Sequence, residues 1–497
     1  MSGDPPGNMN TRDNARVLTL QTGGLGDLVL TSELIGSLKS HHPEWTVVLA
    51  CRAELEAIAG LFPIPPDEVI GLPLNPYFNR QPSDELRRVL ESVVHRFDGL
   101  QADILIDGSL RPTWLTWFVA ALLQPGVSVC CAGVPEPEAM LSTLLDWFGL
   151  ARRELMDLGP PPEIHERDRY GLLLDYLEIP RVSVFPWRPP PVWESEARGW
   201  LDANGLPGGG FIACFPYGTG SVPLKRWPRD RFIRIIDSLQ AQGFPVLLFG
   251  ESAEREQLNA IAQELPRKPA PVFCGDSLRL PLAASVLSKA AAYLGNDTGP
   301  AHLAQAYGVG GVAVFGGGVE SPRYAPWAAG SIGLVHPLPC SGCYWDCFLG
   351  RGLCVESIPA EAVAEAMSSV LQSRQEARMV SVQVLDPAVL SLVEDASARY
   401  RVAQRDRARR LEVILELTRA NERLQPGAVR PDDQARIGEL EKVASERLAV
   451  LEAVHAEAAK RQTMIEELTA AVREREVRIG ALERALAART RDRAGRK

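Results

Sequence analysis

The sequence predicts an α/β protein with two lobes of similar size, each built on a parallel β-sheet covered by helices, and a helical extension after them. Short apolar runs typical of buried strands alternate with amphipathic runs typical of helices, and this alternation occurs twice along the chain. A Pro-rich stretch at 180–191 separates the two halves. Beyond Pro387 the composition shifts to Ala, Glu, Arg and Leu with few aromatic residues, which is typical of long helices.

The first half is predicted to consist of repeated strand–helix–strand units, which pair parallel strands and bury them on both faces. The predicted strands cover 16–22, 46–50, 69–72, 102–107 and 127–132, and the predicted helices cover 28–40, 83–97 and 112–123. The Pro-rich stretch that follows is too stiff and too poor in N–H donors for a central element. We therefore expect it to approach an interdomain linker.

The second half repeats this scheme and ends with one more helix and a short strand. The predicted strands cover 211–215, 245–249, 272–274, 292–294, 311–315 and 380–385, and the predicted helices cover 229–242, 253–264, 280–290, 300–307 and 359–372. We expect a first lobe at 14–185 and a second lobe at 205–374, with a cleft between them.

The C-terminal segment carries the pattern of a coiled coil. A helical extension is predicted at 387–424, a break with Pro and Gly follows at 425–431, and a seven-residue apolar repeat then runs through 434–490. The repeat comprises Ile437, Ala444, Leu451, Ala458, Ile465, Val472, Ile479 and Leu486, and its partner series is interrupted by Arg447, Arg461 and Arg475. The arginines weaken a strict two-stranded seam and leave the oligomer order open. We expect a homo-oligomer formed through this coiled coil, in preference to binding of a specific partner protein.

Charge and hydropathy exclude several classes of protein. Lys and Arg number 53 against 62 Asp and Glu, a formal net charge of −9, whereas nucleic-acid binding needs a basic face. No apolar run is long enough to cross a bilayer, and the first residues lack the charged and apolar regions of a signal peptide. We expect a cytoplasmic protein, peripheral at the inner membrane if it meets a membrane, with no nucleic-acid partner and no transmembrane segment.

The first candidate site is the loop Gly23-Gly24-Leu25-Gly26-Asp27, at the junction of the first strand and the first helix. It matches the dinucleotide-binding fingerprint only in part, because the third glycine and a later acidic residue are missing at the expected spacing. Asp27 has two interpretations that the local sequence does not separate. It can cap the helix N-terminus, or it can be a carboxylate that takes a proton from an acceptor hydroxyl.

Two further loops follow strands of the second half, where ligands of open α/β sheets bind. The loop at 215–228 is rich in Gly, Ser and Thr and ends in the cations Lys225 and Arg226. The loop at 295–302 leads into a helix, whose free N–H groups favour an anion. Each loop alone could be a solvated turn or a helix cap, but together they predict a site for a diphosphate.

Three ordered motifs make the sequence resemble glycosyltransferase family 9, the ADP-heptose heptosyltransferases of lipopolysaccharide synthesis and their relatives. The motifs are Gly24–Val29, Lys225–Pro228 and Asn296–His302 followed by Val314–Gly316, and the likeness covers about 16–372. The resemblance implies a GT-B architecture of two Rossmann-like lobes and an inverting sugar transfer that needs no metal or other cofactor. It also implies a nucleotide-sugar donor, ADP-heptose above all, bound mainly by the second lobe. The acceptor would be a lipopolysaccharide-core sugar or a protein side chain.

The resemblance also assigns roles to residues that match the motifs. Asp27 would be the general base. The implied donor-binding residues are Gly26, Thr219, Ser221, Lys225, Glu254, Asp297, Thr298, Gly299 and His302. Among them, Ser221 and Lys225 would contact the phosphates, and Glu254 would reach the nucleotide ribose. His302 lies one turn into its helix, where a packed or capping histidine is an equal alternative.

Four of the nine cysteines cluster near the end of the second lobe. Cys340, Cys343, Cys347 and Cys354 have the count and compactness of a tetrahedral metal site. Free thiols are the main alternative, and a disulfide pair is the lesser one. Four thiolates accept zinc and iron alike, so the cluster predicts a structural zinc or iron ion without choosing between them. The resemblance agrees, since some relatives that glycosylate proteins hold iron in a comparable insert.

Two other functions compete with glycosyl transfer. One is a catalytically inactive GT-B scaffold that acts through its coiled coil, and the presence of Asp27, Lys225 and Asp297 weighs against it. The other is a nicotinamide-dependent enzyme. It is disfavoured because no well-placed acidic residue follows the first glycine loop.

Overall fold

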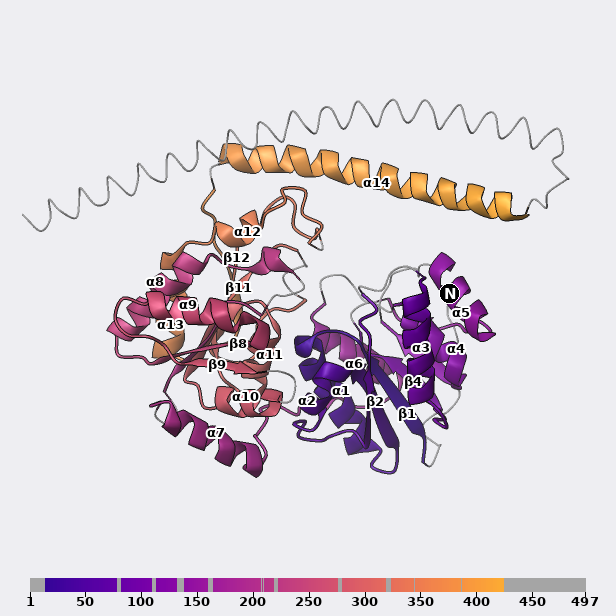
Figure 1. The fold of residues 1–497 in the computed structure, drawn as a ribbon, viewed down its shortest axis with the longest axis horizontal. Helices are drawn as coiled ribbons and strands as arrows, with labels where there is room; N and C mark the ends of the chain where they lie inside the picture. Colours follow the sequence, from indigo (N-terminus) through magenta and orange to yellow (C-terminus); the bar gives the residue numbers. More distant parts are fainter. Residues whose placement is uncertain are drawn as a thin grey trace, which may run out of the picture. The chain divides into compact units, whose positions relative to one another are not determined.

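The computed structural model describes residues 14–423 with short gaps. The gaps are 78–81, 110–112, 132–137, 160–163, 207, 209, 219–221, 276–278, 319–322, 344 and 386. The described residues up to Arg401 form one compact unit, and Val402 begins a second unit. The first unit holds two separate sheets, which form two lobes (Figure 1).

The first lobe is built on a six-stranded sheet with the order β3-β2-β1-β4-β5-β6, in which all neighbours are parallel. The strands are β1 (Arg16–Gln21), β2 (Thr46–Arg52), β3 (Glu68–Leu72), β4 (Ile104–Asp107), β5 (Val127–Cys130) and β6 (Met156–Asp157). The helices are α1 (Leu25–His41), α2 (Glu56–Ala59), α3 (Asp84–Arg96), α4 (Trp114–Leu123), α5 (Glu138–Phe148) and α6 (Glu166–Tyr176). The strand order reverses between β1 and β4, so the loop after β1 lies at a topological switch point.

The second lobe is built on a seven-stranded parallel sheet with the order β13-β12-β11-β10-β7-β8-β9. Its strands are β7 (Ile212–Phe215), β8 (Val246–Glu251), β9 (Val272–Gly275), β10 (Ala292–Asn296), β11 (Gly311–Phe315), β12 (Ser331–Val335) and β13 (Arg378–Ser381). Its helices are α7 (Pro191–Ala203), α8 (Arg229–Ala241), α9 (Arg255–Glu264), α10 (Leu280–Leu287), α11 (Gly299–Ala306), α12 (Leu353–Glu356) and α13 (Ala360–Gln372). The switch point here lies between β7 and β10, the two strands whose following loops were predicted to bind a diphosphate.

The prediction of two Rossmann-like lobes with parallel sheets is confirmed. The central strands are buried along their length, as expected for a sheet covered by helices on both faces. Two differences concern the ends of elements. The first helix begins at Leu25 rather than at 28, and the last strand spans Arg378–Ser381 rather than 380–385.

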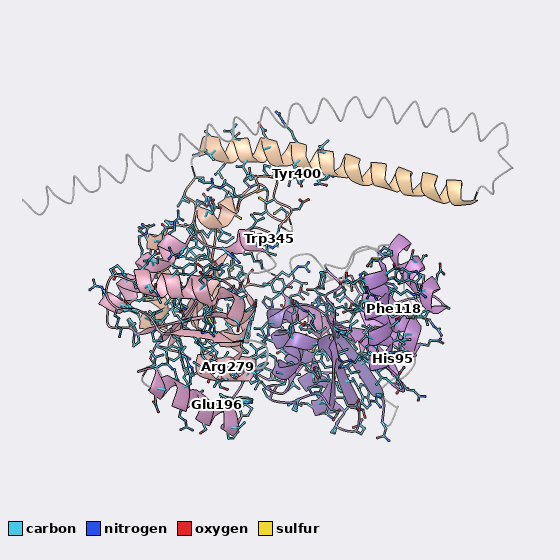
Figure 2. All side chains as sticks on the ribbon, in the orientation of Figure 1. His95, Phe118, Glu196, Arg279, Trp345 and Tyr400 are labelled. Atoms are coloured by element: carbon cyan, nitrogen blue, oxygen red, sulfur yellow. The ribbon has the colours of Figure 1, made fainter. Side chains whose placement is uncertain are left out.

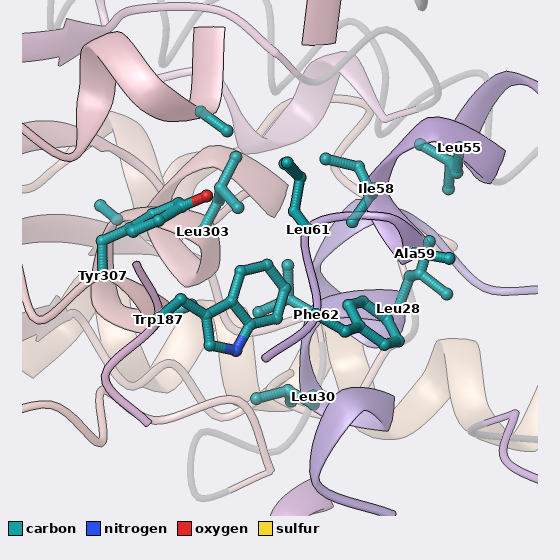
Figure 3. Packing of buried hydrophobic residues seen from close by; sticks show 14 of the residues in the cluster. Leu28, Leu30, Leu55, Ile58, Ala59, Leu61, Phe62, Trp187, Leu303 and Tyr307 are labelled. Atoms are coloured by element: carbon teal, nitrogen blue, oxygen red, sulfur yellow. The ribbon is translucent and has the colours of Figure 1, made fainter. Parts of the chain in front are cut away.

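The Pro-rich stretch packs between the lobes and is more than the approach to a linker. Trp187 donates its backbone N–H to the carbonyl of Ala306 at 2.7 Å. Its indole lies between Phe62 of the first lobe and Tyr307 of the second, with ring centroids 5.3 and 5.8 Å away (Figure 3). The lobes therefore share one apolar cluster, to which this aromatic side chain contributes.

The helical extension is present as α14 (Pro387–Arg423). Val393 and Ser397 on its first turns are buried, and Tyr400 lies 5.6 Å from Phe348 between ring centroids. The predicted coiled coil at 434–490 lies outside the described residues. Within the described part of the chain, no helix is both long and apolar enough to cross a membrane.

Candidate active site

A cleft of about 1090 Å³ is lined by residues of both lobes at the carboxyl ends of their strands. Eight of the residues predicted for the site line it: Gly26, Asp27, Lys225, Glu254, Asp297, Thr298, Gly299 and His302. The other two, Thr219 and Ser221, lie outside the described residues. The loops after β1, β7 and β10 thus meet in one cleft because each follows a strand at a switch point.

Asp27 lies in the first turn of α1, and Gly24 is the residue at the N-cap. Asp27 is therefore not the N-cap residue itself, but its side chain does cap the helix N-terminus from the third helical position, as part of a capping box. Its Oδ2 accepts a hydrogen bond from the backbone N–H of Gly24 at 2.8 Å. Its Oδ1 accepts one from the hydroxyl of Tyr324 at 2.8 Å. Both carboxylate oxygens are thus held in place at the wall of the cleft.

Tyr324 is a site residue that the sequence did not reveal. It belongs to the loop between β11 and β12 of the second lobe and lines the cleft where it contacts Asp27 of α1. Burial, together with the negative charge of Asp27, raises the pKa of Tyr324 well above its ordinary value. The phenol therefore stays protonated and donates directly to Asp27 of the first lobe. No motif marks this tyrosine, because only the folding of the second lobe brings it to the carboxylate.

The N-termini of α1 and α11 meet at the cleft. A Cβ atom on Gly299 would lie 2.6 Å from Cβ of Leu25, so only glycine permits this approach. Thr298 occupies the N-cap of α11 without a capping hydrogen bond from its side chain, and its hydroxyl donates instead to the carbonyl of Asn296 at 3.4 Å. In the described part of the chain, Thr298 thus leaves the first N–H groups of α11 without a cap from its side chain, at a helix N-terminus that would stabilise an anion.

His302 is packed into the wall of the cleft. Its side chain is 6% exposed, and its Nε2 lies 3.9 Å from Oδ1 of Asp297. Its ring contacts that of Tyr324 at 5.9 Å between centroids, and Gly26 packs against its other edge. Burial lowers the pKa of His302, although the carboxylates of Asp297 and Asp27 oppose this shift. The imidazole is therefore neutral at neutral pH, as expected for a packed histidine.

Lys225 brings a positive charge to the cleft. It ends a 3₁₀ turn at Pro223–Lys225, and its Nζ lies 3.4 Å from both Oδ2 and the carbonyl oxygen of Asp297. Buried Asn296 joins the two loops, because its side chain accepts from the N–H of Trp227 at 2.9 Å and donates to the carbonyl of Pro216 at 3.0 Å. The cation and the N-terminus of α11 consequently face the same space.

Glu254 also lines the cleft and is 7% exposed. Its Oε1 accepts from the N–H of Gly218 at 2.8 Å, and its Oε2 accepts from the N–H of Glu251 at 3.0 Å. The carboxylate therefore supports the loop after β7 as well as lining the cleft. Part of the cleft wall is apolar and includes Phe249, Phe273, Leu280, Ala283 and Leu287.

A buried polar network supports the loop that carries Tyr324. Glu166, 1% exposed at the start of α6, accepts from Arg169 Nε at 2.6 Å and from Arg323 at 3.4 Å. His165, the N-cap of α6, accepts at Nδ1 from the N–H of Arg167 at 3.1 Å and donates from Nε2 to the carbonyl of Ala325 at 3.0 Å. These contacts join α6 of the first lobe to residues 323–325 of the second.

We expect the free energy of unfolding to fall in acid because of His165. Burial lowers the pKa of His165 to about 4, whereas the unfolded chain takes up the proton near pH 6.5. Protonation therefore favours the unfolded chain as the pH falls from about 6.5 to about 4. Between pH 7 and pH 4.5, the free energy of unfolding of the wild type should fall by about 2 kcal/mol more than that of His165→Asn. Asn is a suitable replacement because it can cap the helix but does not titrate. Urea unfolding measures this difference, and equal losses would contradict it.

The four clustered cysteines line a separate small pocket of about 20 Å³, together with Trp345 and Leu224. Burial and the neighbouring thiols raise the pKa of Cys340 to about 11. The donor set suits zinc or iron, but among the described residues no group of three or more side chains is arranged to hold a metal ion. The arrangement of the thiols thus does not itself form the predicted site. All nine cysteines are free, and the remaining five are buried.

Comparison with known proteins agrees with this architecture. The sequence profile of glycosyltransferase family 9 (heptosyltransferase) matches residues 202–344. Lipopolysaccharide heptosyltransferase 3 of Escherichia coli (strain K12) is 30% identical over 324 residues, which are 62% of this chain and 84% of that protein. Lipooligosaccharide heptosyltransferase 2 of Campylobacter jejuni is 29% identical over 161 residues, or 31% of this chain. The match to the Campylobacter protein spans 50% of its length.

Solved structures share the fold. The glycosyl transferase family 9 structure from Veillonella parvula has a TM-score of 0.55 at 21% identity and covers 72% of this chain and 98% of its own. E. coli ADP-heptose lps heptosyltransferase II has a TM-score of 0.52 at 17% identity, with the same coverage of 72% and 98%. Because the E. coli strain K12 relative is matched over most of its length, this chain belongs to glycosyltransferase family 9, the heptosyltransferase family.

Proposed function

We propose that the protein transfers a sugar, heptose above all, from a nucleotide diphosphate donor to a hydroxyl of a saccharide or protein acceptor. One observation carries the proposal: a held carboxylate, Asp27, and a cationic anion-binding corner, Lys225 with the N-terminus of α11, line the same cleft. Transfer with displacement of a diphosphate needs both features, a base for the acceptor and positive stabilisation for the leaving group. Family membership supports the same reaction class.

The second lobe, predicted at 205–374 and extended in the structure by α7 and β13, would bind the donor. The apolar wall at Phe249 and Phe273 suits a nucleobase, and Glu254 lies between this wall and the loop after β7, where a ribose would fit. Lys225 and the first N–H groups of α11 would hold the diphosphate. The first lobe, at 14–185, would bring the acceptor to Asp27.

The proposed reaction is a single displacement. Asp27 accepts the proton of the acceptor hydroxyl as its oxygen attacks the anomeric carbon, and the bond to the diphosphate oxygen breaks on the opposite face. The configuration at that carbon is therefore inverted. Lys225 and the dipole of α11 stabilise the charge that develops on the departing diphosphate, so that no metal ion is needed in this step. Tyr324 keeps Asp27 oriented by donating to the oxygen that Gly24 does not engage.

A panel of nucleotide sugars tests this proposal. Purified protein is incubated with ADP-, UDP- and GDP-linked sugars and with saccharide or peptide acceptors, and release of the nucleoside diphosphate is measured. We expect release with an ADP-linked heptose that depends on the acceptor. No release with any pair would favour the inactive scaffold. Tight dinucleotide binding without any binding of sugar nucleotides would instead favour a nicotinamide-dependent enzyme.

We also propose that Cys340, Cys343, Cys347 and Cys354 bind a structural zinc or iron ion. The support is their number, their compact spacing and their common pocket. Elemental analysis of the purified protein should give about one such ion per chain, and the ion should be lost in a Cys340→Ser/Cys343→Ser variant. A metal-free protein with four titratable thiols in the cluster would contradict the assignment.

For the C-terminal segment we propose a homo-oligomer formed through the coiled coil at 434–490, in a cytoplasmic protein that is peripheral at the inner membrane if it meets a membrane. The support is the heptad repeat in the sequence. Light scattering of the full chain and of a chain ending at 433 would compare their masses. A full chain with the mass of a monomer would contradict the oligomer.

A further inference from the structure

We infer that Trp345 is a positioning residue for Lys225: its indole face holds the lysine ammonium at the mouth of the diphosphate site. The inference rests on the proposed function and adds a residue that lies in the four-cysteine segment, outside the motifs. It also gives that segment, 340–354, a task in donor binding.

The contact between the two side chains has the geometry of a cation–π interaction. Nζ of Lys225 lies 5.2 Å from the centroid of the Trp345 ring, within the range of about 6 Å in which this attraction acts. The lysine side chain is 23% exposed, and among the described residues its Nζ also lies 3.4 Å from Oδ2 and from the carbonyl oxygen of Asp297. An aromatic face holds an ammonium without adding a negative charge. The cation thus remains free to neutralise a diphosphate, which a second carboxylate would prevent.

The backbone conformation of Trp345 indicates that its side chain is held in this position for a functional reason. Its φ angle is +66°, in the left-handed region that large side chains rarely adopt. Such conformations persist only where the surrounding structure enforces them, and they concentrate at binding sites. The left-handed backbone conformation of Trp345 therefore has a free-energy cost that the contacts of its side chain must offset.

The surroundings of the indole fix its orientation (Trp345 is labelled in Figure 2). A Cβ atom on Gly316 or Gly318 would lie 2.3 or 2.2 Å from the indole ring, so the ring packs directly on this backbone. These glycines follow β11, at the same edge of the sheet as the cleft. The N–H of Gly317 between them donates to Sγ of Cys354 at 3.3 Å, which ties the loop to the cysteine segment.

The cysteine segment also touches the turn that carries Lys225. Leu224, the residue before the lysine, lines the pocket formed by the cysteines and Trp345. The competing explanation is that the indole only covers this pocket and meets the lysine by proximity. The two explanations differ in one respect: positioning makes the effect of changing Trp345 depend on the presence of Lys225.

A double-mutant cycle on ADP affinity tests this dependence. ADP is titrated by calorimetry into the full-length wild type, Trp345→Leu, Lys225→Ala and the double variant. We expect Trp345→Leu to weaken ADP binding by about three- to thirtyfold in the presence of Lys225 and to have no further effect in its absence. Phe348→Leu, in the same segment, is the matched control, because Phe348 contacts Tyr400 rather than Lys225.

A second series avoids changes of shape. Tryptophans with one to four ring fluorines are incorporated at position 345, which weakens the negative face of the ring while keeping its outline. The ADP dissociation constant should then rise stepwise with fluorine number. A flat series, or an equal loss on Trp345→Leu with and without Lys225, would overturn the inference and leave the proposed function intact. A wild type that binds no nucleoside diphosphate would overturn both.

Discussion

Replacing Asp27 with Asn is expected to lower kcat by at least about a hundredfold, the usual span for loss of a general base being about 10²–10⁴. The amide keeps the size of the side chain, and its oxygen can still accept from the N–H of Gly24. The tyrosine hydroxyl can rotate to accept from the amide nitrogen, so the local structure should persist. ADP affinity should therefore change little, because only the proton acceptor is lost. Steady-state kinetics and ADP titration measure the two effects separately.

A matched control removes the same charge elsewhere. Asp98, with a side chain 68% exposed and close to His95, does not line the cleft, and Asp98→Asn should leave kcat unchanged. The kcat of Tyr324→Phe should lie between those of Asp27→Asn and Asp98→Asn, because this change frees one oxygen of Asp27 without removing the base. Full turnover in Asp27→Asn would show that another group accepts the proton.

Replacing Lys225 with Ala is expected to weaken ADP binding by about ten- to a hundredfold and to lower the turnover rate as well. A hydrogen bond to a charged group contributes about 1.5–3 kcal/mol, and here the cation faces a diphosphate. The carboxylate of Asp297 would also lose its cation at 3.4 Å and repel the ligand. Calorimetry with ADP and kinetics with the donor measure the loss.

Lys268→Ala is the control for this change, because Lys268 is exposed on the same lobe and does not line the cleft. Its affinity for ADP should match that of the wild type. Unchanged affinity and turnover in Lys225→Ala would remove the lysine from the site, whatever the other loops contribute.

The sheets could be predicted because their strands are short, largely apolar runs, as in β11, and because strand–helix alternation dictates a parallel arrangement. The family resemblance is likewise confirmed by the relatives. Other elements escaped prediction for physical reasons. Helix α6 has buried charges at Glu166 and Arg169, which interrupt the apolar periodicity of a packed helix. Strand β6 has only two residues, too few for a pattern.

In the site, the loops could be found because glycines and capping residues follow strands. Their meeting in one cleft then follows from strand order, which places the loops after β7 and β10 side by side. Tyr324 and Trp345 could not be found this way, because their partners lie far away in the sequence and no local pattern links them. The predicted roles of Asp27, Lys225 and the donor-binding residues stay predictions until kinetics and ligand binding test them.

A crystal structure of the protein with ADP tests the proposed donor site most directly. We expect the diphosphate within about 3 Å of Lys225 Nζ and of the first N–H groups of α11, with the base against Phe249 and Phe273. Asp27 should remain across the cleft, where an acceptor would stand. ADP bound elsewhere, or bound in the cleft with its phosphates away from Lys225 and α11, would show that the cleft is not the proposed donor site.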